Sequence, residues 1–482
     1  MHRVKACFDN TYTRLPEVFY ARQAPTPVRE PELAIFNTGL AAELGIDLSG
    51  LDEAELAAYC AGNRIPEGAQ PIALAYAGHQ FGNFVPTLGD GRALLMGELV
   101  DVHGRRRDLQ WKGSGRTPFS RGGDGRSALG PVLREYLVSE AMYALGLPTS
   151  RALAATLTGE RVFREEPLPG GVLIRVAASH VRIGTFEYFG VRGDLESLRR
   201  LTAYVIDRHD PDLADGERPA LQLLAAVSRR QAGLVADWMS IGFIHGVMNT
   251  DNMSISGETI DFGPCAFMDE YDPATVYSYI DRRGRYAYGN QPAVLQWNLA
   301  RLAEALLPMI HDVPEEAVAM ASEVLTQVPG WYREAWLGRL RGKLGLVGAE
   351  PDDLALAEAL LALMHAEQAD FTNTFRALAG VAAGLAVLPT AFESWRRDWE
   401  ARLARDPREG LAERLRAANP AFIPRNHQVE RALEAAVREG NLTPFRRLHE
   451  VLQRPFEDQP EAAAFADPPR VDERIGHTFC GT

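Results

Sequence analysis

Two short stretches decide the fold of this chain: His245-Gly246-Val247-Met248-Asn249-Thr250-Asp251-Asn252, and then Asp261-Phe262-Gly263. Magnesium in proteins prefers a few carboxylate and carbonyl oxygens, completed by phosphate oxygens in octahedral geometry. The amide of Asn252 and the carboxylate of Asp261 are oxygen ligands of this kind. The two stretches therefore predict a metal site with Asn252 and Asp261 as its protein ligands.

The same spacing resembles the H-R-D-x-x-x-x-N catalytic loop and the D-F-G turn of protein kinases. Asn252 lies seven residues after His245, as in that pattern. Val247 occupies the position of the kinase catalytic Asp and cannot accept a proton. Asp251 stands immediately before the metal-binding Asn, so we predict that it is the general base, with turn capping as the alternative. His245 is interpreted as a structural residue that braces the loop.

The composition indicates a large globular protein. The chain has 482 residues, 46% of them hydrophobic, a net charge of -13 and a pI near 5.4. An acidic protein without a basic face is not expected to bind nucleic acid or anionic membranes. No apolar run is long enough for a membrane span, and no targeting segment is recognisable, so a cytoplasmic protein is expected. The four cysteines form no CxxC pair, which argues against a zinc site.

Periodicity and turn signals divide the chain into five parts. We predict an α+β protein with a kinase-like bilobal fold: a β-rich N-lobe, a helical C-lobe and additional C-terminal helices. The predicted parts are a lead-in wrapped on the core (1–75, with a short helix over 31–44), the N-lobe (76–186), the C-lobe with the catalytic loop and DFG turn (187–310), a helical extension (311–455) and an extended or poorly ordered tail with the terminal Cys (456–482).

Three strands joined by tight turns are predicted over residues 83–88, 92–100 and 108–112. The last strand ends on Lys112, where a kinase places the lysine that neutralises ATP phosphates. Helices are predicted over 128–145 and 219–241, the first at the position of the kinase αC helix. The expected partner of Lys112 is an acid on this helix, Glu135 or Glu140, and Glu135 is favoured. The alternative for Lys112 is a solvated surface lysine.

A local excess of positive charge lies between residues 105 and 134, where arginines alternate with glycines. Glycines let backbone amides approach an anion, and guanidinium groups bind phosphate oxygens in pairs. Arg175 stands inside an apolar run, so it needs a buried partner. Arg182 follows seven residues later and is expected to converge with it. A flexible charged surface loop is the alternative for any single arginine of the 105–134 segment.

With these motifs the chain resembles the selenoprotein-O (YdiU) family. Three further stretches carry the resemblance: the opening Phe8-Asp9-Asn10, the glycine- and arginine-rich run 113–125 and the end Cys480-Gly481-Thr482. The resemblance implies a pseudokinase-like protein adenylyltransferase that binds ATP in an inverted orientation and transfers AMP to protein hydroxyls. UMP transfer is also implied for some members. It implies Mg²⁺ or Mn²⁺, and acceptor proteins that carry Ser, Thr or Tyr. The implied nucleotide-binding residues are Gly89, Gly91, Arg92, Lys112, Asp124, Gly125, Arg175, Arg182 and Asp261, with Asn252 and Asp261 on the metal and Asp251 as base.

Two other functions stay open on the sequence: a phosphotransferase acting on a small molecule, and a catalytically dead pseudokinase that binds ATP as a scaffold. A complete metal site argues against the scaffold. A further hypothesis is that oxidation joins Cys265 to Cys480 and pins the tail over the cleft, lowering activity. Two unrelated free thiols in a reducing cytosol are its alternative.

Overall fold

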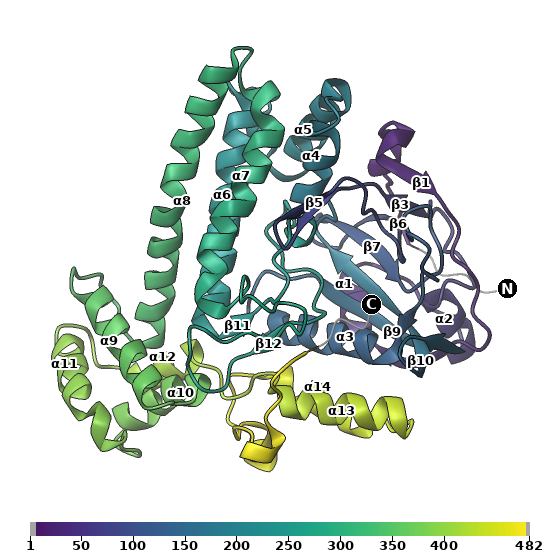
Figure 1. The fold of residues 1–482 in the computed structure, drawn as a ribbon. Helices are drawn as coiled ribbons and strands as arrows, with labels where there is room; N and C mark the ends of the chain where they lie inside the picture. Colours follow the sequence, from purple (N-terminus) through teal and green to yellow (C-terminus); the bar gives the residue numbers. More distant parts are fainter. Residues whose placement is uncertain (1–5, 479–482) are drawn as a thin grey trace.

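An antiparallel sheet forms the N-terminal half of the protein in the computed structural model, which describes residues 6–478 (Figure 1). Its seven main strands follow the order β1-β3-β6-β7-β10-β9-β2, and β8 pairs with β10. The strands are β1 (Tyr20–Arg22), β2 (Glu32–Phe36), β3 (Ile72–Leu74), β6 (Ala93–Val100), β7 (Arg106–Lys112), β8 (Ser127–Ala128), β9 (Arg151–Phe163) and β10 (Pro167–Ala177).

The helix predicted over residues 31–44 is wrong in its first part. Residues Glu32–Phe36 form strand β2, which pairs with β9 at the sheet edge. Helix α1 (Thr38–Glu43) begins only after Asn37, whose side-chain oxygen accepts a hydrogen bond from the Leu40 backbone at 2.9 Å. Pairing with a distant strand outweighs local helix propensity here, and the cap sets where the helix starts.

The strand predicted over residues 83–88 has a different partner from the one expected. Strand β5 (Asn83–Val85) pairs with β4 (Gly78–Gln80) in a separate hairpin, and β3 takes the place beside β6 through Ile72 and Leu95. The other two predicted strands are confirmed as β6 and β7. Residues 78–85, called the clamp hairpin below, therefore stand apart from the sheet.

Each face of the sheet is covered by helices. Helix α3 (Leu129–Ala144) packs on one face, and α13 (Asn426–Arg438) and α14 (Thr443–Leu452) cover its far side (Figure 1). This second layer is apolar, with Leu133 and Tyr136 against Phe445. The opposite face packs under α1 and α2 (Glu53–Cys60). The predicted helix over 128–145 is confirmed, and it is buried on both sides.

The rest of the chain is helical. Helices α6 (Pro219–Ser240), α7 (Gln291–Ile310) and α8 (Pro314–Lys343) pack side by side (Figure 1). The other helices are α4 (Ile183–Gly190), α5 (Leu195–His209), α9 (Asp353–Ala366), α10 (Phe371–Ala382), α11 (Glu393–Leu403) and α12 (Leu411–Ala418). A β-rich region followed by this helical region is the α+β, kinase-like bilobal arrangement predicted. Among the described helices, none has the length and apolar character that would cross a membrane.

The segment after Pro455 is more ordered than predicted. It contains two 3-10 helices, Pro460–Phe465 and Val471–Glu473, and Ala462 is fully buried. The Thr478 backbone N–H donates to Tyr277 O at 2.7 Å, and its hydroxyl donates to Pro264 O at 2.6 Å. Packing against the body therefore replaces the extended tail expected up to this residue. Cys480 lies outside the described residues, so its bond to Cys265 stays a prediction.

Candidate active site

Lys112 is placed at the end of β7 with its side chain toward α3 and the DFG turn. Its ammonium group lies 2.6 Å from Glu135 Oε2 and 2.7 Å from Asp261 Oδ1. The predicted pair of Lys112 with Glu135 is confirmed. β7 and α3 thus fix one positive charge directly against the Asp of the DFG turn.

Two buried arginines converge on the same aspartate. Arg175, on β10, lies 2.8 Å from Asp261 Oδ1 and 3.1 Å from Glu135 Oε1, with its other nitrogens on the Gln110 amide oxygen. Arg182, just before α4, lies 3.0 Å from Asp261 Oδ2. Both guanidinium groups are almost fully buried, with 2% and 3% of each residue exposed. The partners that the sequence required for Arg175 are thus Glu135, Gln110 and Asp261.

Asp261 is the electrostatic centre of the site. Burial alone would raise the pKa of its carboxyl, but Arg175, Lys112 and Arg182 outweigh burial and hold the pKa well below its usual value. Its backbone has φ +63°, a conformation that residues other than glycine adopt infrequently. Strained residues of this kind concentrate at functional sites. The structure therefore holds an ionised carboxylate between three positive groups.

Asp251 lies beside this cluster in a nearly dry position, with 7% of the residue exposed. Gln80 donates a hydrogen bond to its Oδ2 at 3.3 Å, and Oδ1 has no hydrogen-bond partner among residues 6–478. Burial raises the pKa of Asp251 to about 6, although Arg182 acts in the opposite direction. A carboxylate with a raised pKa and one free oxygen is suited to accept a proton.

Asn252, which follows Asp251 in the chain, is half-buried. Its amide nitrogen donates to Val247 O at 2.9 Å, which leaves the amide oxygen as a ligand. Within the described part of the chain, no three His, Cys, Asp or Glu residues are grouped as a metal-binding set. A divalent cation fits here only with phosphate oxygens, because the carboxylate of Asp261 is otherwise surrounded by three positive groups. The donor set thus matches a metal that enters with a nucleotide.

Gly89 and Gly91 approach the glycine- and arginine-rich loop so closely that a side chain would collide with it. A Cβ on Gly89 would lie 2.3 Å from the Phe119 ring, and one on Gly91 would lie 2.9 Å from Phe119 O. Arg92 follows them and lines a small cavity with Lys112, Ser127, Glu135 and Gly263. These glycines therefore let the loop pack closely against the segment that leads into Arg92.

Asp124 and Gly125 lie on that loop but at some remove from the charged cluster. Asp124 is half-buried and forms an ion pair with Arg164 at 2.9 Å, and it forms no hydrogen bond or ion pair with Lys112 or Asp261. Gly125 has φ +70°, and a Cβ there would lie 2.1 Å from Gly115 O. The loop conformation requires glycine at this position. The structure thus places both residues in the loop that borders the site, with Asp124 held by an arginine of its own.

The clamp hairpin is the part of the site that sequence reasoning missed. The His79 backbone N–H donates to Thr250 Oγ1 at 2.7 Å, and the Phe81 N–H donates to Asn249 Oδ1 at 3.0 Å. Phe81 and Gly82 both have positive φ, as in a type I′ turn. Asn or Asp normally takes the first of these positions, so Phe-Gly is a weak turn signal. The hairpin holds the loop that carries Asp251.

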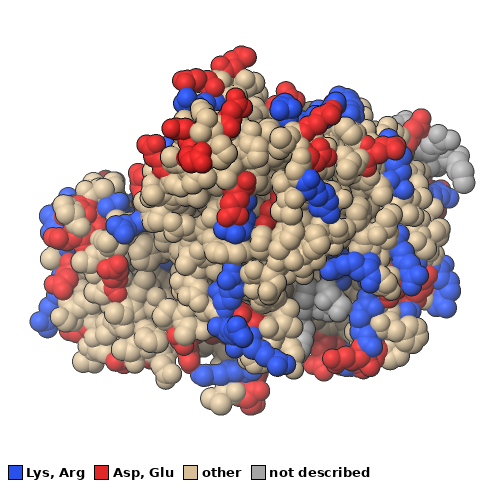
Figure 2. All heavy atoms as spheres, turned by 45° about the horizontal axis from the view of Figure 1, so that its top comes forward, with Lys and Arg blue, Asp and Glu red and all other residues tan. Residues whose placement is uncertain are grey.

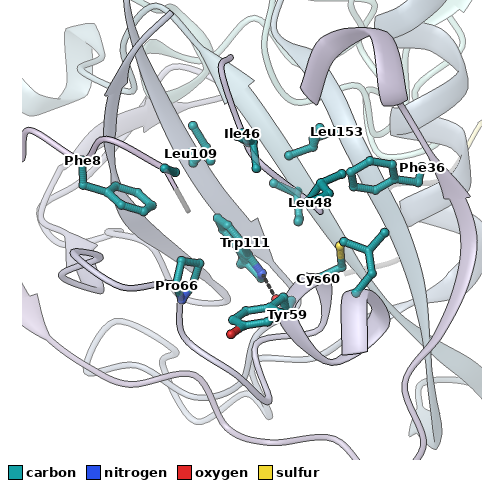
Figure 3. A pocket seen from close by; sticks show the side chains of 13 residues that line it. Phe8, Phe36, Ile46, Leu48, Tyr59, Cys60, Pro66, Leu109, Trp111 and Leu153 are labelled. Atoms are coloured by element: carbon teal, nitrogen blue, oxygen red, sulfur yellow. Dashed lines mark hydrogen bonds between the residues drawn. The ribbon is translucent and has the colours of Figure 1, made fainter. Parts of the chain in front are cut away.

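An apolar cavity lies behind the lysine strand, on the opposite face of the sheet. Trp111, Cys60 and Leu153 are among its lining residues, and the Trp111 indole N–H donates to Tyr59 O at 3.1 Å (Figure 3). Successive residues of a strand point to opposite faces. Trp111 therefore anchors β7 in the apolar core while Lys112 faces the charged cluster.

Comparison with known proteins supports the family resemblance over nearly the whole chain. A family model described as "Protein adenylyltransferase SelO" matches residues 2–453. Relatives named "Protein nucleotidyltransferase YdiU" are 58% identical in Rhizobium leguminosarum bv. trifolii, over 98% of this chain and 97% of the relative, and 57% identical in Rhizobium meliloti, over 98% and 99%. A relative of the same name in Bradyrhizobium diazoefficiens is 56% identical over 98% and 99%. This agreement along the chain, with a buried cationic cluster around the DFG aspartate, assigns the protein to the SelO family of protein nucleotidyltransferases.

Proposed function

We propose that this nucleotidyltransferase transfers AMP from ATP to Ser, Thr or Tyr hydroxyls of proteins, and UMP from UTP by the same site. The observation that carries this proposal is the triple cationic contact of Asp261 beside the buried carboxyl of Asp251. A kinase needs one lysine at this point, whereas this site adds two buried guanidinium groups.

The cationic cluster is matched to a polyphosphate. Lys112, Arg175 and Arg182 share the carboxylate of Asp261, so all three would lie within reach of the phosphate oxygens of a bound nucleotide. Asn252 and Asp261 would hold Mg²⁺ or Mn²⁺, which would supply charge neutralisation at the reacting phosphate. Gly89, Gly91, Arg92, Asp124 and Gly125 line the nucleotide on the loop side. Fixed donors in a site of low polarity stabilise developing negative charge more strongly than water does.

The proposed nucleotide orientation is the inverted one, and the two buried arginines beside Lys112 support it. With the β- and γ-phosphates on Arg175 and Arg182, the α-phosphate lies toward Asp251 and the acceptor. Asp251 accepts the proton of the acceptor hydroxyl, the oxygen attacks the α-phosphorus, and the bond to the β-phosphate oxygen breaks. Pyrophosphate leaves with the electron pair of that bond and remains neutralised by the arginines.

Labelled ATP tests this proposal directly. We expect label from α-labelled ATP on acceptor protein and none from γ-labelled ATP, because phosphoryl transfer would keep the γ label and release ADP. Lys112→Ala and Asp261→Ala should lose the α label. Asp251→Asn should lower the transfer rate by about 10²–10⁴-fold while nucleotide binding persists, as expected for a general base.

The other outcomes identify the competing functions. Label from γ-ATP alone would show a phosphotransferase. Tight ATP binding with neither label on any acceptor would show a scaffold. Repeating the assay with α-labelled UTP, and with Mn²⁺ in place of Mg²⁺, determines the nucleotide and metal preference. A cytoplasmic location stays a prediction from the sequence.

A further inference from the structure

A turn after the DFG motif presents two arginines to solvent in a rigid frame. The carboxylate of Asp281 accepts hydrogen bonds from the backbone N–H groups of Arg285 at 3.0 Å and Tyr286 at 2.7 Å. Arg282 and Arg283 are exposed between these anchors, and neither forms an ion pair or hydrogen bond with any side chain of residues 6–478. We call residues 280–285 the arginine turn.

This arrangement stands out on a surface where opposite charges are otherwise mixed. Figure 2 shows basic and acidic side chains intermingled over one face of the molecule. Many exposed arginines elsewhere have carboxylate partners, for example Arg105 with Glu43 at 2.6 Å, whereas others such as Arg116 and Arg199 have none among residues 6–478. The protein has a net charge of -13. Arg282 and Arg283 are neighbouring guanidinium groups without a carboxylate partner among residues 6–478, so both are available to bind carboxylates of another molecule.

The arginine turn is connected to the catalytic base through the clamp hairpin. The Tyr286 hydroxyl donates to Asn249 Oδ1, which also accepts from the Phe81 N–H, and the Phe81 and Tyr286 rings lie 5.1 Å apart. A Cβ built on Gly82 would lie 3.6 Å from the guanidinium carbon of Arg285. Gln80, on the same hairpin, contacts Asp251. The turn thus packs against the hairpin that contacts Asp251.

Two further features favour protein docking over a solvated loop. Arg285 is held in place, because its guanidinium lies 4.6 Å from the centroid of the Trp297 ring. Ile280 starts the turn with 59% of the residue exposed. An exposed aliphatic side chain beside arginines on a preorganised turn is typical of a protein interaction surface.

We propose that the arginine turn is the docking surface for the acceptor protein and that it selects acceptor segments with acidic residues beside the modified hydroxyl. This inference rests on the proposed function, since it names the substrate class of the same site. Arg282 and Arg283 bind the acceptor carboxylates, and Ile280 packs on an apolar residue of the same segment. Guanidinium groups match carboxylates in bidentate geometry, so the preference is for Asp or Glu.

Charge reversal on the enzyme, combined with charge reversal on the acceptor, tests the proposal. Three acceptors are made by fusing a disordered tag to the same carrier protein. Each tag contains one Ser, one Thr and one Tyr, and these residues are flanked by Asp in the first tag, by Asn in the second and by Lys in the third. The full-length protein, the double variant Arg282→Glu/Arg283→Glu and the control Arg199→Glu are compared by kcat/KM for α-label transfer. Arg199 is an exposed arginine of α5, remote in the chain from the turn.

We expect the unaltered protein and the control to prefer the Asp tag over the Asn tag by about threefold for each ion pair formed, the scale of exposed pairs. The double variant should reverse the order and prefer the Lys tag, with unchanged thermal unfolding and nucleotide affinity. The same Asp preference in the double variant, or no charge preference in any protein, would overturn the docking surface. Absence of α label on every acceptor would overturn the proposed function itself, which is a different result.

Discussion

At the scale of single residues, Gly78 occupies the tightest position beside the base. A Cβ there would lie 2.7 Å from Asp251 Oδ1 and 2.9 Å from its Cβ. Gly78→Ala must displace Asp251, and a shift of about 1 Å at a reacting group can cost about 10²-fold in rate. We expect a loss of α-label transfer of that order with nucleotide affinity retained.

Gly233→Ala is the matched control for this prediction. Gly233 lies within α6, and a Cβ there meets nothing within 4 Å. Alanine should be neutral or slightly stabilising at this helical position. Full transfer activity in Gly78→Ala would show that Asp251 does not need its present position.

Lys343 shows how a buried charge affects stability. Its ammonium group lies 4.4 Å from the Phe375 ring centroid and 5.7 Å from that of Phe371, and it has no ion pair among residues 6–478. Burial lowers the pKa of Lys343 from 10.5 to about 7. Between these pH values the unfolded chain binds more protons, so stability rises as the pH increases from 7 toward 10.

Lys343→Met should remove this dependence. We expect the variant to be more stable by on the order of 3 kcal/mol at pH 6, because no charge is buried, with a difference that shrinks toward pH 10. Urea denaturation at several pH values measures this. A constant difference across pH 6 to 10 would contradict the assignment of the titrating group.

At the scale of elements, the two faces of β7 have different roles: Trp111 on one face contributes to stability, and Lys112 on the other face contributes to transfer. Trp111→Ala should destabilise the fold by about 3–5 kcal/mol, because it leaves a cavity between the sheet and α2. Lys112→Ala, one residue on, should abolish transfer with a smaller loss of stability. Urea denaturation and the α-label assay on both variants check this division. Equal destabilisation by the two changes would contradict it.

The clamp hairpin shows why some elements escape prediction. Its type I′ turn contains Phe81, whose positive φ is compensated by contacts with Asn249 and Tyr286 far along the chain. Helix α3 and strands β6 and β7 were predictable because their apolar patterns and turns are local. Strand β2 was not, because its pairing with β9 overrides the local helical pattern.

At the scale of the whole molecule, the C-terminal helices support the helix that carries Glu135. Phe445 of α14 is fully buried, and its ring centroid lies 6.2 Å from that of Tyr136 on α3. Phe445→Ala should destabilise the protein by about 3–5 kcal/mol. It should also lower nucleotide affinity, because α3 then holds Glu135 and Lys112 less firmly.

Phe163→Ala is the control for this long-range effect. Phe163 ends β9 with 72% of the residue exposed, so its removal should change stability by less than about 0.5 kcal/mol. Thermal unfolding and ATP titration of both variants measure the effect. Unchanged nucleotide affinity in a destabilised Phe445→Ala would show that α3 holds its position without the C-terminal layer.

The sequence by itself determined the family resemblance, the α+β class, the pair of Lys112 with Glu135 and the positions of Asp251, Asn252 and Asp261 near one another. These features depend on short spacings and on helix or strand periodicity, which are local properties. Only the tertiary structure decided that Arg175 and Arg182 share Asp261, that the clamp hairpin holds the catalytic loop and that the segment up to Thr478 is ordered. These contacts join residues tens to hundreds of positions apart, and their energies come from burial and pairing that no local pattern contains.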